Sequence, residues 1–299
     1  MIKIGHLAPV IGVVAMWLLA QGCATKNTRA LPPQGDLTDQ AIFGQYTVST
    51  FRSQEGHGAW QITRDGKPVR GGQGWVFKIG QVSPEEGGMP ADCLGKDING
   101  DGTPDIVIYE WTGGAHARFI ARVVELSGDC RLIAEIDGID SVPRFQDLNS
   151  DGVLEVVLED KTYRYWPSSY AASPAPTVIL RWNRGKYLAD AKLTATPLPS
   201  RDKIKEKAER VARDPQWARG PSGQYSRSYI PRELLQTALD LMYGGHEEEG
   251  WEFIRLAWTP KYPVDSGLLE ELKSLMDRSP YWMEIKEQRA SDRSVEETR

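Results

Sequence analysis

A nine-residue pattern of acidic and amide side chains occurs twice in the sequence and constrains the fold more than any other feature. The first copy runs from Asp97 to Asp105 and the second from Asp147 to Glu155, and both read D-x-N-x-D-G-x-x-D/E. The glycine in the sixth position permits a sharp backbone turn. Each copy leads directly into a short segment rich in β-branched residues, which favours a strand. The sequence therefore predicts the same turn-and-strand unit at two places in one fold.

The two loops also carry the oxygen atoms that a calcium ion requires. Calcium takes about six to eight oxygen ligands, and such a loop aims side chains 1, 3, 5 and 9 inward while position 7 offers its carbonyl. Without a cation, the acidic groups of each loop would repel one another. We therefore expect a structural calcium ion in each loop. The predicted ligands are Asp97, Asn99, Asp101, Thr103 and Asp105 in the first loop and Asp147, Asn149, Asp151, Val153 and Glu155 in the second.

The loops differ from complete EF-hands, and this leaves an alternative. The bidentate glutamate of an EF-hand at position 12 is replaced by Ile108 in the first copy and Leu158 in the second. The alternative interpretation is a pair of Asx and Asp-Gly turns that bind no metal. The repetition of the same offsets favours calcium, with water completing the coordination shell.

Residues 41–198 have the pattern of an all-β domain built from short strands. Asp65 and Gly66 separate two alternating runs, and this dipeptide is typical of a two-residue hairpin turn with positive φ at both positions. The strand spacing favours a sandwich, barrel or propeller-like stack. The expected strands lie near residues 46–51, 60–64, 67–69, 75–78, 106–111, 119–126, 131–136, 156–158, 163–166 and 177–182.

Residues 199–285 change to helical periodicity. Apolar residues recur at helical offsets within 231–243, within 247–258 and from residue 266 onward, and proline or glycine bounds these segments. We expect them to form a small bundle, followed by a charged tail over residues 286–299 that frays. The predicted fold class is α+β, with a propeller-like or sandwich-like domain of short antiparallel strands followed by a small C-terminal helical domain.

The N-terminus resembles the leader of a bacterial lipoprotein. Lys3 precedes an apolar stretch that is too short to span a bilayer, and this stretch ends in LLAQGC at Cys23. Ala20 stands where a lipobox usually has leucine. The resemblance implies a signal peptide over residues 1–23, a lipidated Cys23 and a tether over residues 24–40; the alternative is an ordinary secretory signal. Ala24 after the cysteine favours the outer membrane, facing the periplasm.

The loops and several other segments resemble a family of repeat proteins. Loops that lead into strands in this way are similar to VCBS and FG-GAP repeats, the calcium-loop units of integrin-like β-propellers. Over nearly the whole mature chain, the sequence resembles bacterial VCBS-repeat lipoproteins of no assigned activity. The resemblance implies propeller-like architecture and bound calcium. The further matching segments are GGAH at 113–116, YWPSS at 165–169, SPAP at 173–176 and SPYW at 279–282.

Composition and missing motifs bear on function. The net charge of -5 argues against nucleic acid as a partner. The sequence lacks a Gly-x-Ser-x-Gly elbow, a Walker loop and a dinucleotide fingerprint. We therefore expect a calcium-stabilised, non-enzymatic binding or scaffold module of the bacterial cell envelope, with an envelope protein or polymer as partner. The alternative is an envelope hydrolase acting on glycan or peptidoglycan, with carboxylates such as Glu110 or Asp140 in an aromatic cleft.

Apart from Cys23, the chain contains Cys93 and Cys130. In an oxidising compartment, an even pair of this kind can form a disulfide. Their spacing does not match a zinc site. The sequence leaves open whether they form a disulfide or remain two free thiols.

Overall fold

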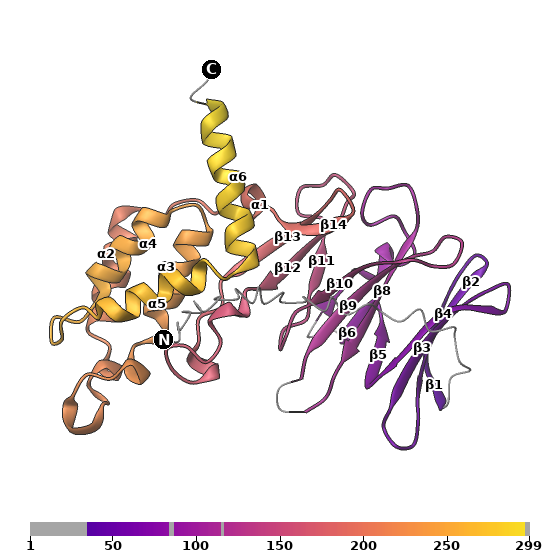
Figure 1. Cartoon of the computed structure of the whole chain (residues 1–299), viewed down its shortest axis with the longest axis horizontal. Coiled ribbons are helices and arrows are strands. Elements are labelled where there is room, and N and C mark those ends of the chain that lie inside the picture. The colour runs from indigo at the N-terminus through magenta and orange to yellow at the C-terminus, as the bar shows by residue number, and fades with distance from the viewer. Residues whose placement is uncertain (1–34, 84–86, 115–116, 297–299) are drawn as a thin grey trace, which may run out of the picture.

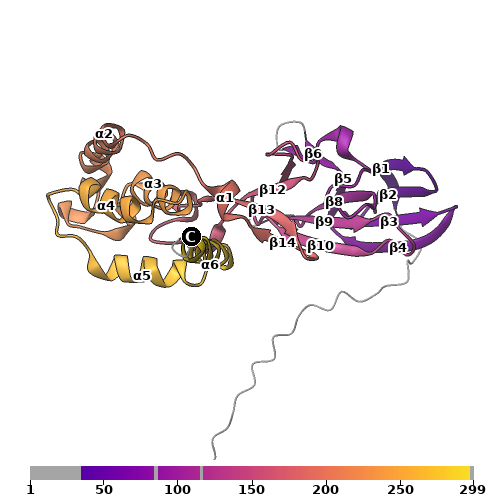
Figure 2. The ribbon, with the colours of Figure 1, turned by 90° about the horizontal axis from the view of Figure 1, so that it is seen from above.

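The computed structural model describes residues 35–83, 87–114 and 117–296. The expected signal peptide, Cys23 and residues 24–34 of the tether lie outside these ranges, as does His116. Three four-stranded sheets follow one another in a row, and the helical segment lies beyond the third (Figures 1 and 2). The expected α+β class is therefore confirmed, with antiparallel sheets of short strands before a C-terminal helical segment. The described residues form no closed barrel.

Each of the three sheets is an antiparallel meander, whose neighbouring strands follow each other in the sequence apart from one small inserted hairpin. Sheet I contains β1 (Asp36–Phe43), β2 (Tyr46–Arg52), β3 (Gly58–Arg64) and β4 (Lys67–Gly74). Sheet II contains β5 (Val76–Ile79), β8 (Asp105–Trp111), β9 (Phe119–Glu125) and β10 (Leu132–Asp137), and the inserted hairpin is β6 (Gln81–Ser83) with β7 (Gly87–Gly88). Sheet III contains β11 (Arg144–Gln146), β12 (Glu155–Glu159), β13 (Thr177–Asn183) and β14 (Lys186–Ala189).

The turn between β3 and β4 confirms the predicted hairpin. Asp65 has φ 50° and Gly66 has φ 74°, and Arg64 pairs directly with Lys67. Both central residues therefore adopt the positive φ that a two-residue turn requires, because its twist then matches that of the strands.

Side chains that alternate along β8 divide the core into two clusters. Ile106 and Ile108 belong to the cluster that packs sheet I against sheet II. Val107 and Tyr109 point to the opposite face and belong to the cluster that continues through sheet III and into the helices. Sheet II is therefore buried on both faces, which accounts for the continuous apolar run of β8.

The helical segment contains five α-helices after a short helical turn that follows β14. The short helical turn is α1 (Ala191–Thr194). The five longer helices are α2 (Arg201–Ala212), α3 (Arg232–Tyr243), α4 (Glu247–Ala257), α5 (Ser266–Met276) and α6 (Pro280–Glu296). Helices α3 to α5 lie where helical periodicity predicts them. Within the described residues, none of the helices combines the length and apolar character that a membrane crossing requires.

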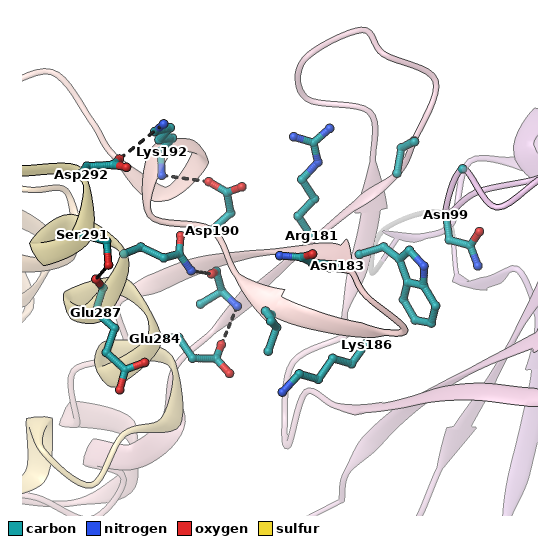
Figure 3. Close-up of a pocket in the computed structure, with 16 residues that line it drawn as sticks. Asn99, Arg181, Asn183, Lys186, Asp190, Lys192, Glu284, Glu287, Ser291 and Asp292 are labelled. Carbon is teal, nitrogen blue, oxygen red and sulfur yellow. Dashed lines mark hydrogen bonds and ion pairs between the residues drawn. The ribbon is translucent and has the colours of Figure 1, made fainter. Parts of the chain in front are cut away.

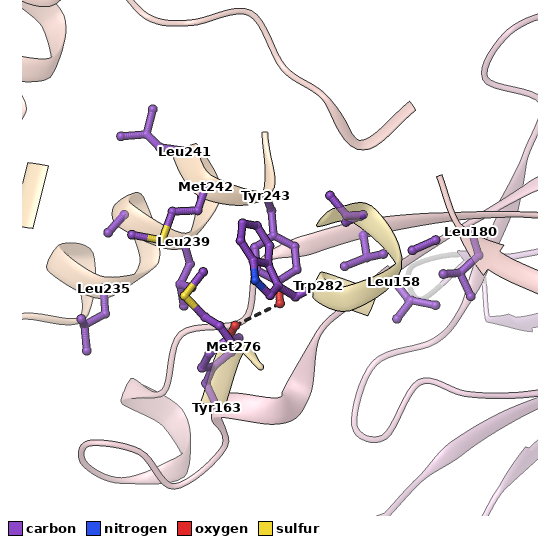
Figure 4. Packing of buried hydrophobic residues seen from close by; sticks show 14 of the residues in the cluster. Leu158, Tyr163, Leu180, Leu235, Leu239, Leu241, Met242, Tyr243, Met276 and Trp282 are labelled. Atoms are coloured by element: carbon purple, nitrogen blue, oxygen red, sulfur yellow. Dashed lines mark hydrogen bonds between the residues drawn. The ribbon is translucent and has the colours of Figure 1, made fainter. Parts of the chain in front are cut away.

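A buried polar cluster joins sheet III to these helices, and the apolar side chains around it are drawn in Figure 4. The Asp160 carboxylate, just after β12, accepts hydrogen bonds from the hydroxyls of Tyr243 at 2.6 Å and Ser279. Tyr163 lies 3.0 Å from the Tyr243 hydroxyl. The apolar cluster around these groups is continuous across both halves of the chain, so the sheets and helices share one core.

Three expectations require correction. Residues 36–40, expected in the tether, form part of β1, which pairs with β2 over residues 36–43. Residues 163–166 are not a strand, because the Asp160 side chain caps a 3₁₀ turn over Lys161–Tyr163 and Tyr165 has a positive φ of 60°. The expected charged tail is helical as far as Glu296, because the Gln288 and Arg289 side chains bond to the backbone of β14 and α3.

Candidate metal centre

The two predicted loops occupy equivalent positions in neighbouring sheets. The first ends at Asp105, the first residue of β8, and the second ends at Glu155, the first residue of β12. Strands β8 and β12 are each the second strand of their sheet, next to β5 and β11. The sequence repeat is therefore a structural repeat: the same loop leads to the same strand in sheets II and III.

The aspartate in the first position organises each loop. The Asp97 carboxylate accepts the backbone amides of Gly100 at 2.8 Å, Asp101 at 3.2 Å and Gly102 at 2.7 Å. In the second loop, the Asp147 carboxylate accepts the amides at the corresponding positions, at 2.7, 3.2 and 3.0 Å. The first position therefore closes the turn in both copies.

The side chains at positions 3 and 5 also match. The Asn99 carbonyl oxygen accepts the Asp101 amide at 2.9 Å, and Asp101 in turn accepts the Thr103 amide at 3.0 Å. The second loop repeats these bonds through Asn149, Asp151 and Val153, at 3.0 and 2.9 Å. Thr103 and Val153 therefore lie where the pattern places them, in position 7 of a shared loop conformation.

The carboxylate at position 9 is buried in both copies. The side chains of Asp105 and Glu155 are 0% exposed. Each accepts one backbone amide of its own loop, from Ile98 at 3.2 Å and from Leu148 at 2.9 Å. Position 9 thus joins each loop to the start of its strand.

Among the described residues, Asp105 has no direct ion pair, although Arg131 interacts with it at longer range. Its Oδ1 atom is buried and has no hydrogen-bond partner in the part of the chain that the structure describes. Burial raises the pKa of Asp105 to about 7, and the nearby charges of Asp101 and Asp97 add to this shift. A buried, unpaired carboxylate oxygen is costly, so either a bound proton or a cation beside it stabilises this group.

The second loop differs because Arg181, on β13, approaches its carboxylates. The Arg181 guanidinium forms an ion pair with Asp151, and its Nε lies 3.7 Å from Oε1 of Glu155. The amide group of Asn149 also lies 3.4 Å from the same Oε1 atom. No local motif in the sequence indicated that Arg181 would take part in this loop.

The loops contact one another across the interface between sheets II and III. The backbone amide of Leu154 donates to the Ile98 carbonyl at 2.8 Å. A Cβ atom on Gly100 would lie 2.9 Å from a methyl group of Val153, and Gly100 has φ 79°. The two loops therefore form one continuous surface.

This surface borders a pocket of about 950 Å³ (Figure 3). Asn99 and the β13–β14 hairpin, including Asn183 and Lys186, line one part of it, and α6 contributes Glu287 and Asp292. The lining is mostly polar and carries both signs of charge. This pocket therefore suits a polar or charged ligand better than an apolar one.

The carboxylates proposed for a hydrolase are held by cations. Glu110 is buried and its Oε2 lies 2.7 Å from Arg122. Asp140 lies 3.0 Å from the Lys161 ammonium. Such pairing is typical of structural ion pairs.

Cys93 and Cys130 are both free thiols. Cys130 lies in the cluster between sheets I and II, whereas Cys93 packs against the other cluster. Burial raises the pKa of Cys130 to about 11, which disfavours the reactive thiolate.

Within the described residues, no group of three or more His, Cys, Asp or Glu side chains gathers closely enough to hold a metal ion. The predicted calcium ligands also include amide and backbone oxygens, which a count of these four side-chain types does not cover. The aspartates also face the backbone amides of their own loops. Calcium binding therefore stays a prediction.

No family model, curated protein or solved structure matches the chain. The fold and the loops define an α+β protein in which two successive antiparallel sheets carry the same acidic loop at the same position.

Proposed function

We propose that the protein is a calcium-stabilised, non-enzymatic binding or scaffold module held in the bacterial cell envelope by a lipidated Cys23. The observation that carries the calcium part is Asp105, whose buried oxygen has no hydrogen-bond partner among the described residues and lies near two further carboxylates. The loop oxygens are hard donors, which suit calcium better than softer metals. Bound calcium supplies positive charge, and the loop side chains hold the starts of β8 and β12 in place.

We further propose that sheets I, II and III are blades of an open, propeller-like row. Each is a four-stranded meander, and the acidic loops recur at the same position in two of them. An ordinary closed propeller has at least about four blades. In this chain the helices cover the far side of the row instead, because they share the core of sheet III.

Thermal unfolding with and without calcium tests the calcium part of the proposal. We expect millimolar calcium to raise the melting temperature of the purified protein above its value in chelator, because an ion that binds only the folded state stabilises it. Asp97→Ala and Asp147→Ala should each reduce this increase. Asp129→Ala, at an exposed turn outside the loops, is the matched control and should leave it unchanged. Equal melting temperatures of the unmodified protein in calcium and chelator would refute the calcium proposal.

We propose that the pocket beside the loops is the binding surface for an envelope polymer. Its polar lining and position between the loops and α6 support this choice. Co-sedimentation with isolated peptidoglycan tests it: the protein should pellet with the polymer, and Lys186→Glu should reduce the bound fraction. Release of soluble fragments from the polymer would instead support the hydrolase. Protein that stays in the supernatant would exclude peptidoglycan as the polymer.

The proposed anchor is tested by metabolic labelling with a fatty acid in a bacterial host. The full chain should incorporate the label, and Cys23→Ser should not. Label in both proteins, or in neither, would contradict lipidation at Cys23. Fractionation of the labelled cells should place the protein with the outer membrane.

A further inference from the structure

We propose that Arg181 is an internal cation of the second loop, so that it competes with calcium there and leaves the first loop as the tighter calcium site. This inference rests on the proposed calcium function. It distinguishes two loops that the sequence pattern presents as equivalent.

The position of Arg181 supports this role. β13 pairs with β12, and this pairing brings the Arg181 side chain beside the loop that precedes β12. Its guanidinium contacts Asp151 and Glu155, the predicted calcium ligands at positions 5 and 9. A guanidinium that lies against two calcium ligands supplies the charge that the ion would otherwise supply. Calcium can use both oxygens only if Arg181 moves away.

The first loop has no equivalent cation. Among the described residues, no lysine or arginine lies within ion-pair distance of Asp97, Asp101 or Asp105. The nearby Arg131 is paired with Glu125 at 2.9 Å and interacts with Asp101 and Asp105 only at longer range. The buried oxygen of Asp105 therefore has neither a hydrogen bond nor an ion pair, whereas the corresponding Glu155 oxygen has contacts from Arg181 and Asn149.

The size of the effect follows from the exposure of the pair. The Arg181 side chain is 40% exposed and Asp151 is 36% exposed. Ion pairs at this exposure contribute up to about 1 kcal/mol, which corresponds to about fivefold in an equilibrium constant. We therefore expect removal of the guanidinium to tighten calcium binding at the second loop by about fivefold.

Calorimetric titration with calcium tests the inference in proteins in which a substitution removes calcium binding at one of the two loops. Asp105→Asn leaves the second loop as the calcium site, and Glu155→Gln leaves the first. Adding Arg181→Gln should increase the affinity about fivefold in the Asp105→Asn protein and leave the Glu155→Gln protein unchanged. Arg184→Gln removes the same charge at an exposed position of the same hairpin and controls for net charge.

The outcomes separate this inference from the proposed function. If the unmodified protein binds no calcium, the proposed calcium function fails. If both loops bind calcium but Arg181→Gln does not change the second loop, or Arg184→Gln has the same effect, only the inference is overturned. Thermal melting of each variant in chelator shows whether the variant is folded. Arg181→Lys is a second substitution, which keeps the positive charge but removes the planar guanidinium.

Discussion

Two carboxylates at equivalent positions differ in how the protein balances their charge. Asp105 and Glu155 each begin a strand, each accept one loop amide and are both fully buried. Glu155 has a neighbouring arginine, whereas one Asp105 oxygen has no partner. Substitution by the neutral amide should therefore have opposite effects at the two sites.

We expect Asp105→Asn to raise the free energy of unfolding in chelator by about 1 kcal/mol, because it removes an uncompensated buried charge. Glu155→Gln should lower it, because the substitution leaves the Arg181 guanidinium without one partner. Urea unfolding in chelator, at a pH above the raised pKa of Asp105, measures both changes. If Asp105→Asn lowered the free energy of unfolding as much as Glu155→Gln, the charges of the two carboxylates would be balanced to the same extent.

A second residue-scale prediction concerns acid stability. Hydrogen bonds from Arg227, at 2.7 and 3.0 Å, lower the pKa of Asp265 to about 2 from an ordinary value of 3.8. Because the folded pKa is the lower one, the stability from this pair is present above pH 3.8 and is lost as the pH falls through about 2.

Asp265→Asn should therefore weaken the pH dependence of stability in that window, with a change of at most about 1 kcal/mol for this partly exposed pair. Asparagine keeps the cap on the Leu268 amide, so α5 should persist. Urea unfolding across the acidic range measures the slope. An unchanged slope would show that other carboxylates determine the acid response.

The sequence predicted the loop residues well because their geometry is local. The backbone amides that bond to the Asp97 carboxylate all come from within its own nine residues. Arg181 could not be predicted in the same way, because its position depends on the pairing of β13 with β12 and on the direction of one side chain.

Among the secondary-structure elements, α6 shows how tertiary contacts extend a helix beyond its apolar sequence, because Gln288 bonds to the backbone of Ala189 and Arg289 to that of Tyr243. Its charged C-terminal part offers little periodicity, so the sequence predicted a fraying tail. Ser279 both accepts the Trp282 amide at 3.0 Å and donates to the buried Asp160 carboxylate. Helix α6 is thus tied at its start to the core of the molecule.

Ser279→Ala should destabilise the protein by about 1–3 kcal/mol, because it removes the cap and leaves a buried carboxylate with one donor fewer. Ser291→Ala, on the exposed part of the same helix, should change stability by less than about 0.5 kcal/mol. Chemical unfolding of both variants measures the difference. Equal effects would mean that the Ser279 contacts contribute little.

At the scale of the whole molecule, the sequence predicted the change from strands to helices but placed a domain boundary near residue 199. Local periodicity reports the change in secondary structure, whereas packing between distant segments decides where a core ends. Here Leu158 and Leu180 of sheet III belong to the same apolar cluster as Leu235 and Met242 of α3.

We therefore expect the sheets and helices to unfold together. The calorimetric enthalpy of unfolding should equal the van't Hoff enthalpy, as in a two-state transition. Two separate heat-absorption peaks would show that the helices unfold independently of sheet III despite the shared cluster.

The two sides of the pocket come from distant parts of the chain. The side formed by α6 is held through Gln288, whose side chain bonds to the backbone of Ala189 and Ala191. Trp282 and Ile285, by contrast, lie earlier in α6 and are buried in the core. Proteolytic trimming that stopped after Lys286 would therefore open the pocket on one side while sheets I and II kept their packing. The length of the C-terminus would then control access to this pocket independently of the acidic loops.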